Sequence, residues 1–363
     1  MHHIMILGAG RIGRLIACLL SESGDYQVTI ADSAINELNQ SFFEKLVHKV
    51  KLIQLDVNQE TELMSALDKY QSQAIVSCLP YFCNVKVAKV AKDKEIKYFD
   101  LTEDTAVTQQ VNTFALNSKN PFIPQCGLAP GFISIVANHL MQQFEVIEAA
   151  YLRVGALPVY PNNVLKYNLT WSTEGLINEC GNPGYGLQNG EEIKLQPLEG
   201  LETLQIDGLL YEAFNTSGGL GSLAQTYYGK IKNLNYKSLR YPGHCQAMRL
   251  LMNDLKLNQD RKTLKRILEN AIPTTEKDVV VIYVAVRGYI QQQYTEKTYV
   301  NKIYPMQFLN QTWSAIQVTT AHSACAIIDE VMTHPNQYQG LIKQEQFSLA
   351  RFLKNRFGQI YDC

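Results

Sequence analysis

The chain has 363 residues, a length that favours two domains over a single core. Its 33 lysines and arginines nearly balance its 34 aspartates and glutamates, so no net charge attracts nucleic acid or an anionic membrane. The longest strongly apolar run, residues 279–286, suits a buried strand, because a membrane-spanning helix needs about 20 residues. We therefore expect neither nucleic acid nor a membrane as a partner.

The eight cysteines are scattered along the chain, without a Cys-x-x-Cys pair or a cluster with histidine. This pattern is typical of reduced thiols and predicts no metal site. The residues before Gly8 are too few for the apolar core of a signal peptide, and they are needed as the first strand. These features together favour a cytoplasmic protein.

The first third of the chain alternates short apolar strands with amphipathic helices. Such alternation predicts parallel strands joined by right-handed crossovers, which gives an α/β fold with a doubly wound, Rossmann-type sheet. The expected strands are residues 3–7, 27–31, 50–55, 74–79, 97–101 and 121–125. The expected helices are residues 11–22, 33–47, 59–70, 84–93 and 104–118.

The turn after the first strand reads Gly-Ala-Gly-Arg-Ile-Gly at residues 8–13. In a strand–turn–helix context, Gly8 allows the tight turn and Gly10 lets a pyrophosphate approach the backbone. Gly13 lets the helix pack closely against the strand. That context is present, because an apolar strand precedes the motif and apolar residues at helical spacing follow it. The motif therefore predicts a dinucleotide-binding site.

Asp32 ends the second strand, 19 residues after Gly13. A carboxylate there can accept hydrogen bonds from the ribose hydroxyls of NAD and would repel the 2′-phosphate of NADP, so we expect NAD as the cofactor. Ligands bind such sheets beyond the carboxyl ends of the strands. The residues expected to contact the nucleotide there are Gly8, Gly10, Arg11, Ile12, Gly13, Asp32, Asp56, Val57, Cys78, Leu79 and Pro80.

After residues 127–131 the strands become longer and richer in tyrosine and threonine, and the loops become richer in glycine and proline. This change predicts a separate α+β domain built on a mixed or antiparallel sheet. Its expected strands are Glu148–Gly155, Leu165–Ser172, Lys237–Arg240, Asp278–Gly288 and Tyr294–Tyr304. The pattern then predicts a strand end running into a helix over residues 313–332, and a last helix over residues 345–357.

Short sequence blocks along nearly the whole chain resemble the saccharopine dehydrogenase family. The resemblance is to the branch that includes lysine 6-dehydrogenase and L-glutamate-forming saccharopine dehydrogenase. The blocks are GAGRIG at 8–13, CLPYF at 78–82, FDLTED at 99–104, CGLAPGF at 126–132, RVGALPVYP at 153–161, LKYNLTWSTEGLI at 165–177, AFNTSGGLGSL at 213–223, LRYPGH at 239–244 and TTAHSACAI at 319–327. The first block is common to many dehydrogenases, whereas LAPG, GALP, YNLTWSTEG and LRYPGH are more specific.

The resemblance implies a Rossmann domain of residues 1–128 with 315–363, and an inserted substrate domain of residues 129–314. It implies oxidation of the carbon–nitrogen bond at the ε-carbon of lysine, or of saccharopine, to aminoadipate semialdehyde. The substrate would be a small molecule of the amino-acid class. The resemblance also implies a homo-oligomer, with a dimer favoured.

Two positions favour lysine over saccharopine as the substrate. Ala129 occupies a turn in which the L-glutamate-forming enzymes usually carry aspartate, and Asp32 stands where their second strand often ends in a basic residue. Trp171 and Ser172 resemble the saccharopine enzymes instead, so an L-glutamate-forming saccharopine dehydrogenase is the alternative. A catalytically silent NAD-binding relative is a second alternative, against which the presence of Arg240 argues.

Oxidising an amine by hydride transfer requires a carboxylate anchor, a proton acceptor and an apolar wall. Arg240 is the expected anchor, since a guanidinium can bind a carboxylate through two parallel hydrogen bonds; a structural ion pair is the alternative. His244 is the expected proton acceptor near neutral pH, and a role in a helix cap or a polar pocket is the alternative. Asp100 and Glu103 follow the fifth strand and are further catalytic candidates, with helix capping or solvation as the alternative.

Three further residues are expected to contact the substrate. Trp171 would form the apolar wall along the lysine methylenes, with core packing as the alternative. Thr216 and Ser217 precede two glycines and would donate hydrogen bonds to the amino-acid head of the substrate. A glycine-rich loop that offers only turn geometry explains these two residues nearly as well.

Overall fold

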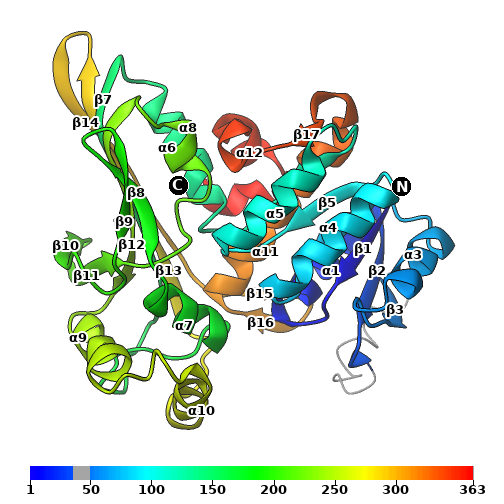
Figure 1. Ribbon diagram of the computed structural model, residues 1–363, viewed down its shortest axis with the longest axis horizontal. Coiled ribbons are helices and arrows are strands. Elements are labelled where there is room, and N and C mark those ends of the chain that lie inside the picture. The colour runs from blue at the N-terminus through cyan, green and yellow to red at the C-terminus, as the bar shows by residue number, and fades with distance from the viewer. Residues whose placement is uncertain (36–49, 363) are drawn as a thin grey trace. The chain divides into compact units, whose positions relative to one another are not determined.

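The computed structural model describes residues 1–35 and 50–362. Within them the chain forms two compact units (Figure 1). The first unit comprises Met1–Phe132 and Thr320–Asp362, and the second comprises Ile133–Thr319.

The family resemblance implies boundaries after residues 128 and 314, and the two units divide after residues 132 and 319. An insertion of the second unit into the sequence of the first explains why the first is made of two segments. The helix expected at residues 33–47 lies largely outside the described residues.

Seven strands of the first unit, as far as the structure describes it, form one parallel sheet in the order β17-β6-β5-β4-β1-β2-β3. The strands are β1 (His2–Leu7), β2 (Tyr26–Asp32), β3 (Val50–Gln54), β4 (Ala74–Ser77), β5 (Lys97–Asp100), β6 (Pro121–Ile123) and β17 (Gly340–Leu341). The helices are α1 (Arg11–Glu22), α3 (Glu60–Lys69), α4 (Asn84–Asp93), α5 (Thr105–Ala115), α11 (Ala315–Thr333) and α12 (Leu349–Lys354). The predicted parallel sheet is confirmed, and β17 extends it beyond the prediction.

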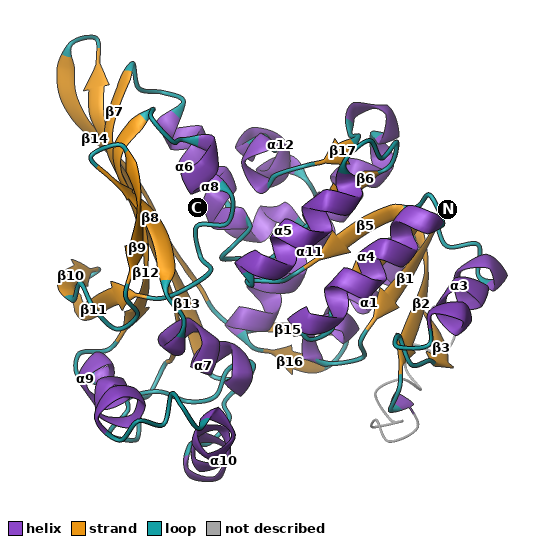
Figure 2. Cartoon of the chain, viewed as in Figure 1, coloured by secondary structure: helices purple, strands orange, loops and turns teal. Residues whose placement is uncertain are grey.

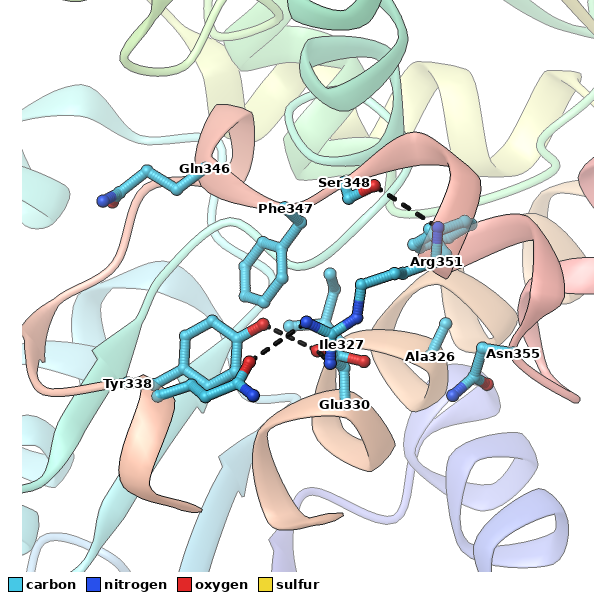
Figure 3. A pocket seen from close by; sticks show the side chains of 11 residues that line it. Ala326, Ile327, Glu330, Tyr338, Gln346, Phe347, Ser348, Arg351 and Asn355 are labelled. Atoms are coloured by element: carbon cyan, nitrogen blue, oxygen red, sulfur yellow. Dashed lines mark hydrogen bonds and ion pairs between the residues drawn. The ribbon is translucent and has the colours of Figure 1, made fainter. Parts of the chain in front are cut away.

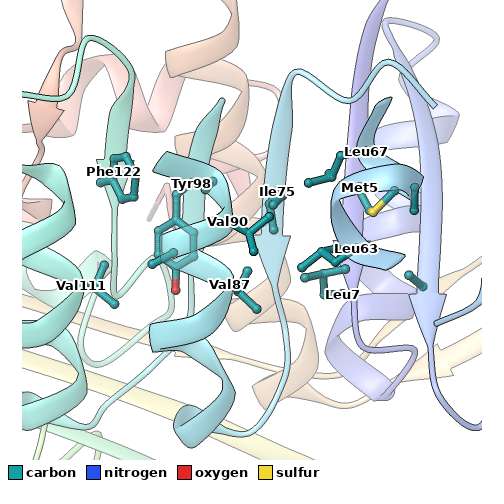
Figure 4. Packing of buried hydrophobic residues seen from close by; sticks show 14 of the residues in the cluster. Met5, Leu7, Leu63, Leu67, Ile75, Val87, Val90, Tyr98, Val111 and Phe122 are labelled. Atoms are coloured by element: carbon teal, nitrogen blue, oxygen red, sulfur yellow. The ribbon is translucent and has the colours of Figure 1, made fainter. Parts of the chain in front are cut away.

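Helices α3, α4 and α5 cover one face of this sheet (Figure 4). Met5 and Leu7 of β1 and Ile75 of β4 point to this face, where they are fully buried. Apolar residues of the three helices, among them Leu63 and Val90, pack against them. Burying this apolar surface is the main free-energy gain that holds these helices to the sheet.

The other face of the sheet carries α1 and α11. Because neighbouring residues of a strand point to opposite faces, Ile4 and Ile6 are buried on this side. The Cys325 thiol of α11 approaches the carbonyl oxygen of Ile16 in α1 at 3.9 Å, so the two helices lie side by side. Helices on both faces make the sheet doubly wound, as the alternation of strands and helices predicts.

The second unit contains a mixed sheet of eight strands, with the path β10-β11-β12-β7-β13-β14 and a branch of β8 and β9 beside β12 (Figure 2). Only β12 and β7 run parallel among the paired strands of this sheet that the structure describes. Its strands are β7 (Val146–Pro158), β8 (Gly184–Gln188), β9 (Glu191–Leu195), β10 (Glu202–Ile206), β11 (Leu209–Asn215), β12 (Ile231–Arg240), β13 (Asp278–Ile290) and β14 (Gln293–Ile303). The expected mixed sheet is confirmed.

Further elements of this unit are short. The helices are α6 (Phe132–Met141), α7 (Thr173–Gly181), α8 (Leu223–Thr226), α9 (His244–Arg249) and α10 (Arg261–Ala271). A small hairpin of β15 (Met306–Phe308) and β16 (Gln311–Trp313) precedes α11. The predicted change from strand to helix over residues 313–332 therefore agrees with the structure.

The strand predicted at Leu165–Ser172 is wrong. The segment is an irregular loop that makes one isolated bridge, from Leu169 to Thr274, and Lys166 adopts a positive φ of 48°. Its residues are not part of a sheet. Tyr167 and Leu169 are instead buried in a cluster with α7, α9 and α10. The alternation therefore reports packing against helices.

The last predicted helix, residues 345–357, is shorter in the structure. The side chain of Ser348 accepts a hydrogen bond from the backbone N–H of Arg351 and caps the start of α12. Asn355 has an extended backbone and ends the helix. Across the described residues, no helix has the length and apolar character needed to cross a membrane.

The turn between β1 and α1 requires glycine at two positions. Gly8 has a positive φ of 98°, a region that L side chains rarely adopt. A Cβ on Gly13 would lie 2.0 Å from the carbonyl oxygen of Gly8, which leaves no room for a side chain. A Cβ on Gly10 would meet no atom within 4 Å. The turn thus packs tightly at Gly13 and is open at Gly10.

Gly13→Ala should destabilise the protein, because either α1 or the turn must move to relieve the overlap with Gly8. We expect a loss of about 1–3 kcal/mol in the free energy of unfolding, measured by urea denaturation. Gly10→Ala is the matched control and should change stability by less than about 0.5 kcal/mol. Equal stability of the two variants would contradict the close packing.

Candidate functional site

The β1–α1 turn presents backbone donors at the carboxyl edge of the parallel sheet. The first helical bond of α1 runs from the N–H of Arg14 to the carbonyl of Gly10. The N–H groups of Arg11, Ile12 and Gly13 therefore precede the intrahelical ladder, as the first N–H groups of any helix do. Together with the helix dipole, such donors bind phosphate groups.

Asp32 lies against this turn. Its carboxylate accepts hydrogen bonds from the backbone N–H of Ala9 at 2.7 Å and of Ala34 at 2.8 Å. Arg14 of α1 donates from Nε to the carbonyl of Ala9 at 2.7 Å. The end of β2 and the glycine turn are thus held together by one carboxylate, which is where the sequence pattern predicts the ribose-binding acid.

The remaining predicted nucleotide contacts lie at the ends of β3 and β4. Asp56 accepts two hydrogen bonds from Asn58, both at 2.9 Å, and Val57 packs partly on the core. The N–H of Cys78 donates to the carbonyl of Leu7 at 2.8 Å. Burial raises the pKa of the Cys78 thiol to about 12, so it is protonated at neutral pH and is a poor nucleophile.

Leu79 and Pro80 continue this edge of the sheet. Leu79 packs partly on the same core, and its side chain would be 3.3 Å from a Cβ on Gly8. Pro80 is exposed and precedes a short 3₁₀ turn at Tyr81–Cys83. The predicted nucleotide-binding residues therefore share one edge of one sheet.

Asp100, a predicted catalytic residue at the end of β5, is fully buried. Its carboxylate accepts hydrogen bonds from Tyr98 Oη at 2.8 Å, from the N–H of Thr102 at 3.1 Å and from the N–H of Gln125 at 2.9 Å. Burial raises its pKa to about 6, against the opposing effect of these hydrogen bonds. Asp100 thus joins the segment after β5 to the segment after β6.

Glu103 lies three residues further on and is half-buried. Burial, with the nearby charges of Asp104 and Asp100, raises its pKa. The catalytic roles of Asp100 and Glu103 stay predictions.

Arg240, the predicted carboxylate anchor, ends β12 and is 3% exposed. Its Nη2 is 3.3 Å from Oε2 of Glu179 in α7, and its Nη1 donates to the carbonyl of Leu239 at 2.8 Å. The guanidinium carbon lies 5.2 Å from the ring centre of Tyr167. Arg240 Nε has no hydrogen-bond partner among the described residues. Neither Glu179 nor Tyr167 is among the site residues predicted from the sequence.

His244, the predicted proton acceptor, is fully buried at the start of α9. Its Nδ1 is 2.8 Å from the carbonyl oxygen of Leu165, so Nδ1 carries the proton and Nε2 is an acceptor. Nε2 has no partner among the residues the structure describes. Burial and the charge of Arg240 lower the pKa of His244 to about 3. In this environment the imidazole is neutral, and its Nε2 can accept a hydrogen bond. The role of His244 as a proton acceptor stays a prediction.

Trp171 is tied to the same group of residues. Its Nε1 donates to Tyr167 Oη at 3.0 Å, and Tyr167 also packs on the imidazole of His244 at 5.3 Å between ring centres. A Cβ on Gly175 would be 2.1 Å from the Trp171 indole, so the ring lies directly on the first turn of α7. Trp171 is half-buried, whereas Tyr167 is fully buried.

The two predicted hydroxyl donors have protein partners. Thr216 Oγ1 and Ser238 Oγ are 2.8 Å apart. Ser238 lies on β12, two residues before Arg240. Ser217 donates from its backbone N–H to the carbonyl of Glu179 and from Oγ to the carbonyl of Asn178, each at 3.1 Å. These bonds hold the loop after β11 to the last turn of α7.

The structure therefore brings the four residues predicted to bind the substrate, together with His244, into one set of contacts. We call this set the Arg240 cluster. It consists of Tyr167, Trp171, Glu179, Thr216, Ser217, Ser238, Arg240 and His244. Glu179 and Tyr167 are far from Arg240 in the sequence and join the cluster through contacts made in the folded chain. The YNLTWSTEG block around Tyr167 is the one signal in the sequence that could have drawn attention to it.

One pocket of about 240 Å³ lies elsewhere, among α11, α12 and the segment between them (Figure 3). There Glu330 accepts a hydrogen bond from Tyr338 Oη at 2.7 Å and pairs with Arg351 at 2.5 Å. A second, open pocket lies between β3 and α3. Neither is lined by a predicted site residue. Among the described residues, no three histidine, cysteine, aspartate or glutamate side chains gather to hold a metal ion.

Comparisons with known proteins connect both units to one family. Residues 4–121 match the family model described as saccharopine dehydrogenase NADP binding domain. Residues 127–356 match the model described as saccharopine dehydrogenase C-terminal domain. The two matches together cover nearly the whole chain.

Two curated relatives illustrate the similarity. Mitochondrial alpha-aminoadipic semialdehyde synthase of Rattus norvegicus is 21% identical over 290 residues, which is 76% of this chain and 30% of the rat protein. Saccharopine dehydrogenase [NADP(+), L-glutamate-forming] of Schizosaccharomyces pombe is 22% identical over 209 residues, which is 56% of this chain and 46% of that protein. The chain thus spans less than half the length of these relatives.

Two solved structures share the fold. Apo saccharopine dehydrogenase (L-Glu forming) from Saccharomyces cerevisiae has a TM-score of 0.79 at 15% identity, covering 99% of this chain and 98% of that one. Homospermidine synthase from Legionella pneumophila, solved in complex with NAD, has a TM-score of 0.69 at 14% identity, covering 99% and 89%.

The raised pKa of Asp100 predicts a pH dependence of stability. The folded-state value of about 6 exceeds the ordinary value of 3.8, so the stability that this group contributes is complete at low pH and is lost as pH rises through 6. Asp100→Asn removes this loss. From pH 5 to pH 8 the unfolding free energy of the native protein should therefore fall by about 1 kcal/mol relative to the variant.

Urea denaturation at several pH values measures this difference. Asp68→Asn, which removes an exposed carboxylate of α3 that pairs with Lys94, is the control for the loss of a surface carboxylate. A difference for Asp100→Asn that stays constant with pH would show that its carboxyl titrates alike in the folded and unfolded chains.

Proposed function

The chain belongs to the saccharopine dehydrogenase family, and on that premise we propose that it is an NAD-dependent dehydrogenase of the lysine ε-carbon. Its reaction would oxidise the carbon–nitrogen bond of free L-lysine to aminoadipate semialdehyde. Oxidation of saccharopine at the same bond is the second candidate. The name of the Schizosaccharomyces relative favours that second candidate.

The nucleotide half of the proposal rests on the β1–α1 turn. Its first-turn N–H groups and the open space above Gly10 suit a pyrophosphate. Asp32, fixed beside the turn by the N–H groups of Ala9 and Ala34, would accept hydrogen bonds from ribose hydroxyls. Its negative charge would oppose a 2′-phosphate, which favours NAD over NADP. When bound, the nucleotide supplies the hydride acceptor.

The substrate half rests on the Arg240 cluster, and one observation carries it. The cluster contains a single cationic side chain, Arg240, which already faces Glu179. Lysine carries one carboxylate, whereas saccharopine carries three. A single guanidinium suits the smaller substrate, and the rings of Tyr167 and Trp171 offer apolar surface for its methylenes.

The reaction also needs a proton acceptor, because an ammonium group has no lone pair to assist the departure of hydride. His244 is neutral and resists protonation, so it suits hydrogen bonding better than proton transfer. Asp100 is fully buried and its carboxylate accepts three protein hydrogen bonds. Glu103 is half-buried with a raised pKa and, like Asp100, is a candidate in the first unit.

The first experiment identifies the substrate. Purified protein with NAD should reduce the nucleotide in the presence of L-lysine, and the rate should rise toward alkaline pH as the ε-amine loses its proton. Absorbance of NADH is the measurement, and reactions without substrate are the control. Turnover of saccharopine alone would establish the second candidate. No turnover of either amino acid, with nucleotide still bound, would indicate a silent NAD-binding relative.

The second experiment tests the cofactor preference. Asp32→Asn keeps an oxygen that can accept from Ala9 and removes the negative charge. We expect the affinity ratio of NAD to NADP to fall at least about tenfold, measured by calorimetric titration of both nucleotides. Asp93→Asn, an exposed change on α4, should leave the ratio unaltered. Equal changes in affinity for the two nucleotides in Asp32→Asn would remove the proposed role of its charge.

A further inference from the structure

Arg240 and Glu179 of the second unit form a buried ion pair. Arg240 is 4% exposed at its side chain and Glu179 is 14% exposed. Bringing both charges out of water is costly, and such a pair stabilises a fold only if its geometry is good. Good hydrogen-bond geometry in this pair would be explained by a contribution to folding, whereas poor geometry points to a further role.

The contact between the two groups is poor. Glu179 Oε2 meets Arg240 through Nη2 at 3.3 Å, whereas charge-assisted hydrogen bonds are typically about 2.7–2.9 Å. The neighbouring donor on the same edge of the guanidinium, Nε, is buried and without a partner among the described residues. A carboxylate that bound Nε and Nη2 together would satisfy both donors in the bidentate geometry that arginine favours.

Glu179 is held in place independently of Arg240. Ser217 donates to the carbonyls of Glu179 and Asn178, which joins the last turn of α7 to the loop after β11. The C-terminal end of a helix disfavours a carboxylate and favours a cation. The carboxylate of Glu179 therefore gains little stabilisation from the dipole of α7. A cation bound beside it would be stabilised by that dipole and also by the carboxylate.

We propose that Glu179 and Arg240 together recognise the head group of an α-amino acid, with Arg240 binding the α-carboxylate and Glu179 binding the α-ammonium. An incoming carboxylate replaces the long contact at Nη2 and satisfies Nε, and the ammonium then neutralises Glu179. Net charge in the buried site is unchanged by such a zwitterion. The inference deepens the proposed function and rests on it for the identity of the amino acid.

The proposed head-group site should discriminate between ligands that carry both an α-amino group and a carboxylate and ligands that lack one of them. L-Lysine and saccharopine both carry an α-amino-acid head, whereas 6-aminohexanoate lacks the α-amino group and 1,5-diaminopentane lacks the carboxylate. A site with only an arginine anchor would accept 6-aminohexanoate as well as lysine. A site with the charge pair discriminates against it, because 6-aminohexanoate offers no α-ammonium group to Glu179.

Binding measurements on the whole chain test this without relying on turnover. Calorimetric titrations with lysine and 6-aminohexanoate, in the presence of NADH, compare the native protein with Glu179→Gln. We expect the variant to lose about 10- to 100-fold in affinity for lysine and less than about threefold for 6-aminohexanoate. Glu174→Gln changes an exposed carboxylate of the same helix, paired with Lys265, and should alter neither affinity.

A complementary variant tests the other half of the pair. Arg240→Lys should weaken both lysine and 6-aminohexanoate, which carry the carboxylate, and leave 1,5-diaminopentane unchanged. Thermal melting of each variant establishes that it is folded. Glu179→Asp retains the charge and should recover part of the preference for lysine even if Glu179→Gln proves unstable.

The outcomes separate the two proposals. Equal losses for lysine and 6-aminohexanoate in Glu179→Gln would show that Glu179 only positions Arg240, and would overturn the inference. Failure of the native protein to bind lysine would overturn it as well. A selective loss for lysine in a protein that turns over neither lysine nor saccharopine would support the head-group site and remove the proposed dehydrogenase activity.

Discussion

The carbonyl oxygen of Gly8 and the α-carbon of Gly13 approach each other too closely for any side chain between them. This contact makes α1 start directly beside the end of β1, so the first-turn N–H groups of the helix lie at the edge of the sheet. The same turn directs the N–H of Ala9 to Asp32 at the end of β2. Backbone geometry, more than any group of side chains, therefore builds the nucleotide site of the first unit.

In the second unit, side chains rather than backbone geometry build the candidate site. Its candidate site is a buried group in which charge, aromatic surface and hydrogen bonds depend on one another. Tyr167 contacts Arg240, His244 and Trp171, and the charge of Arg240 helps to keep His244 neutral. Replacing such a network with apolar residues would often favour folding, so its presence agrees with a role in recognition.

Sequence reasoning succeeded where structure is local. Strands and helices of the first unit alternate over short distances, and the glycine turn, Asp32 and the parallel order of the sheet follow from that regularity. The prediction failed at Leu165–Ser172, where apolar alternation reflects packing on helices. It also missed Glu179, because its contact with Arg240 joins residues 61 positions apart. The hairpin β10–β11 was also not predicted, because β10 is half exposed and carries a weak apolar pattern.

The positions of the two tryptophans give the protein a built-in optical probe. Trp313 is 1% exposed and its indole N–H donates to the carbonyl of Phe308, so dissolved quenchers cannot reach it. Trp171 is half-buried within the Arg240 cluster. Quenchable fluorescence of the folded chain therefore originates from the indole beside Tyr167, and changes in that emission report directly on the cluster.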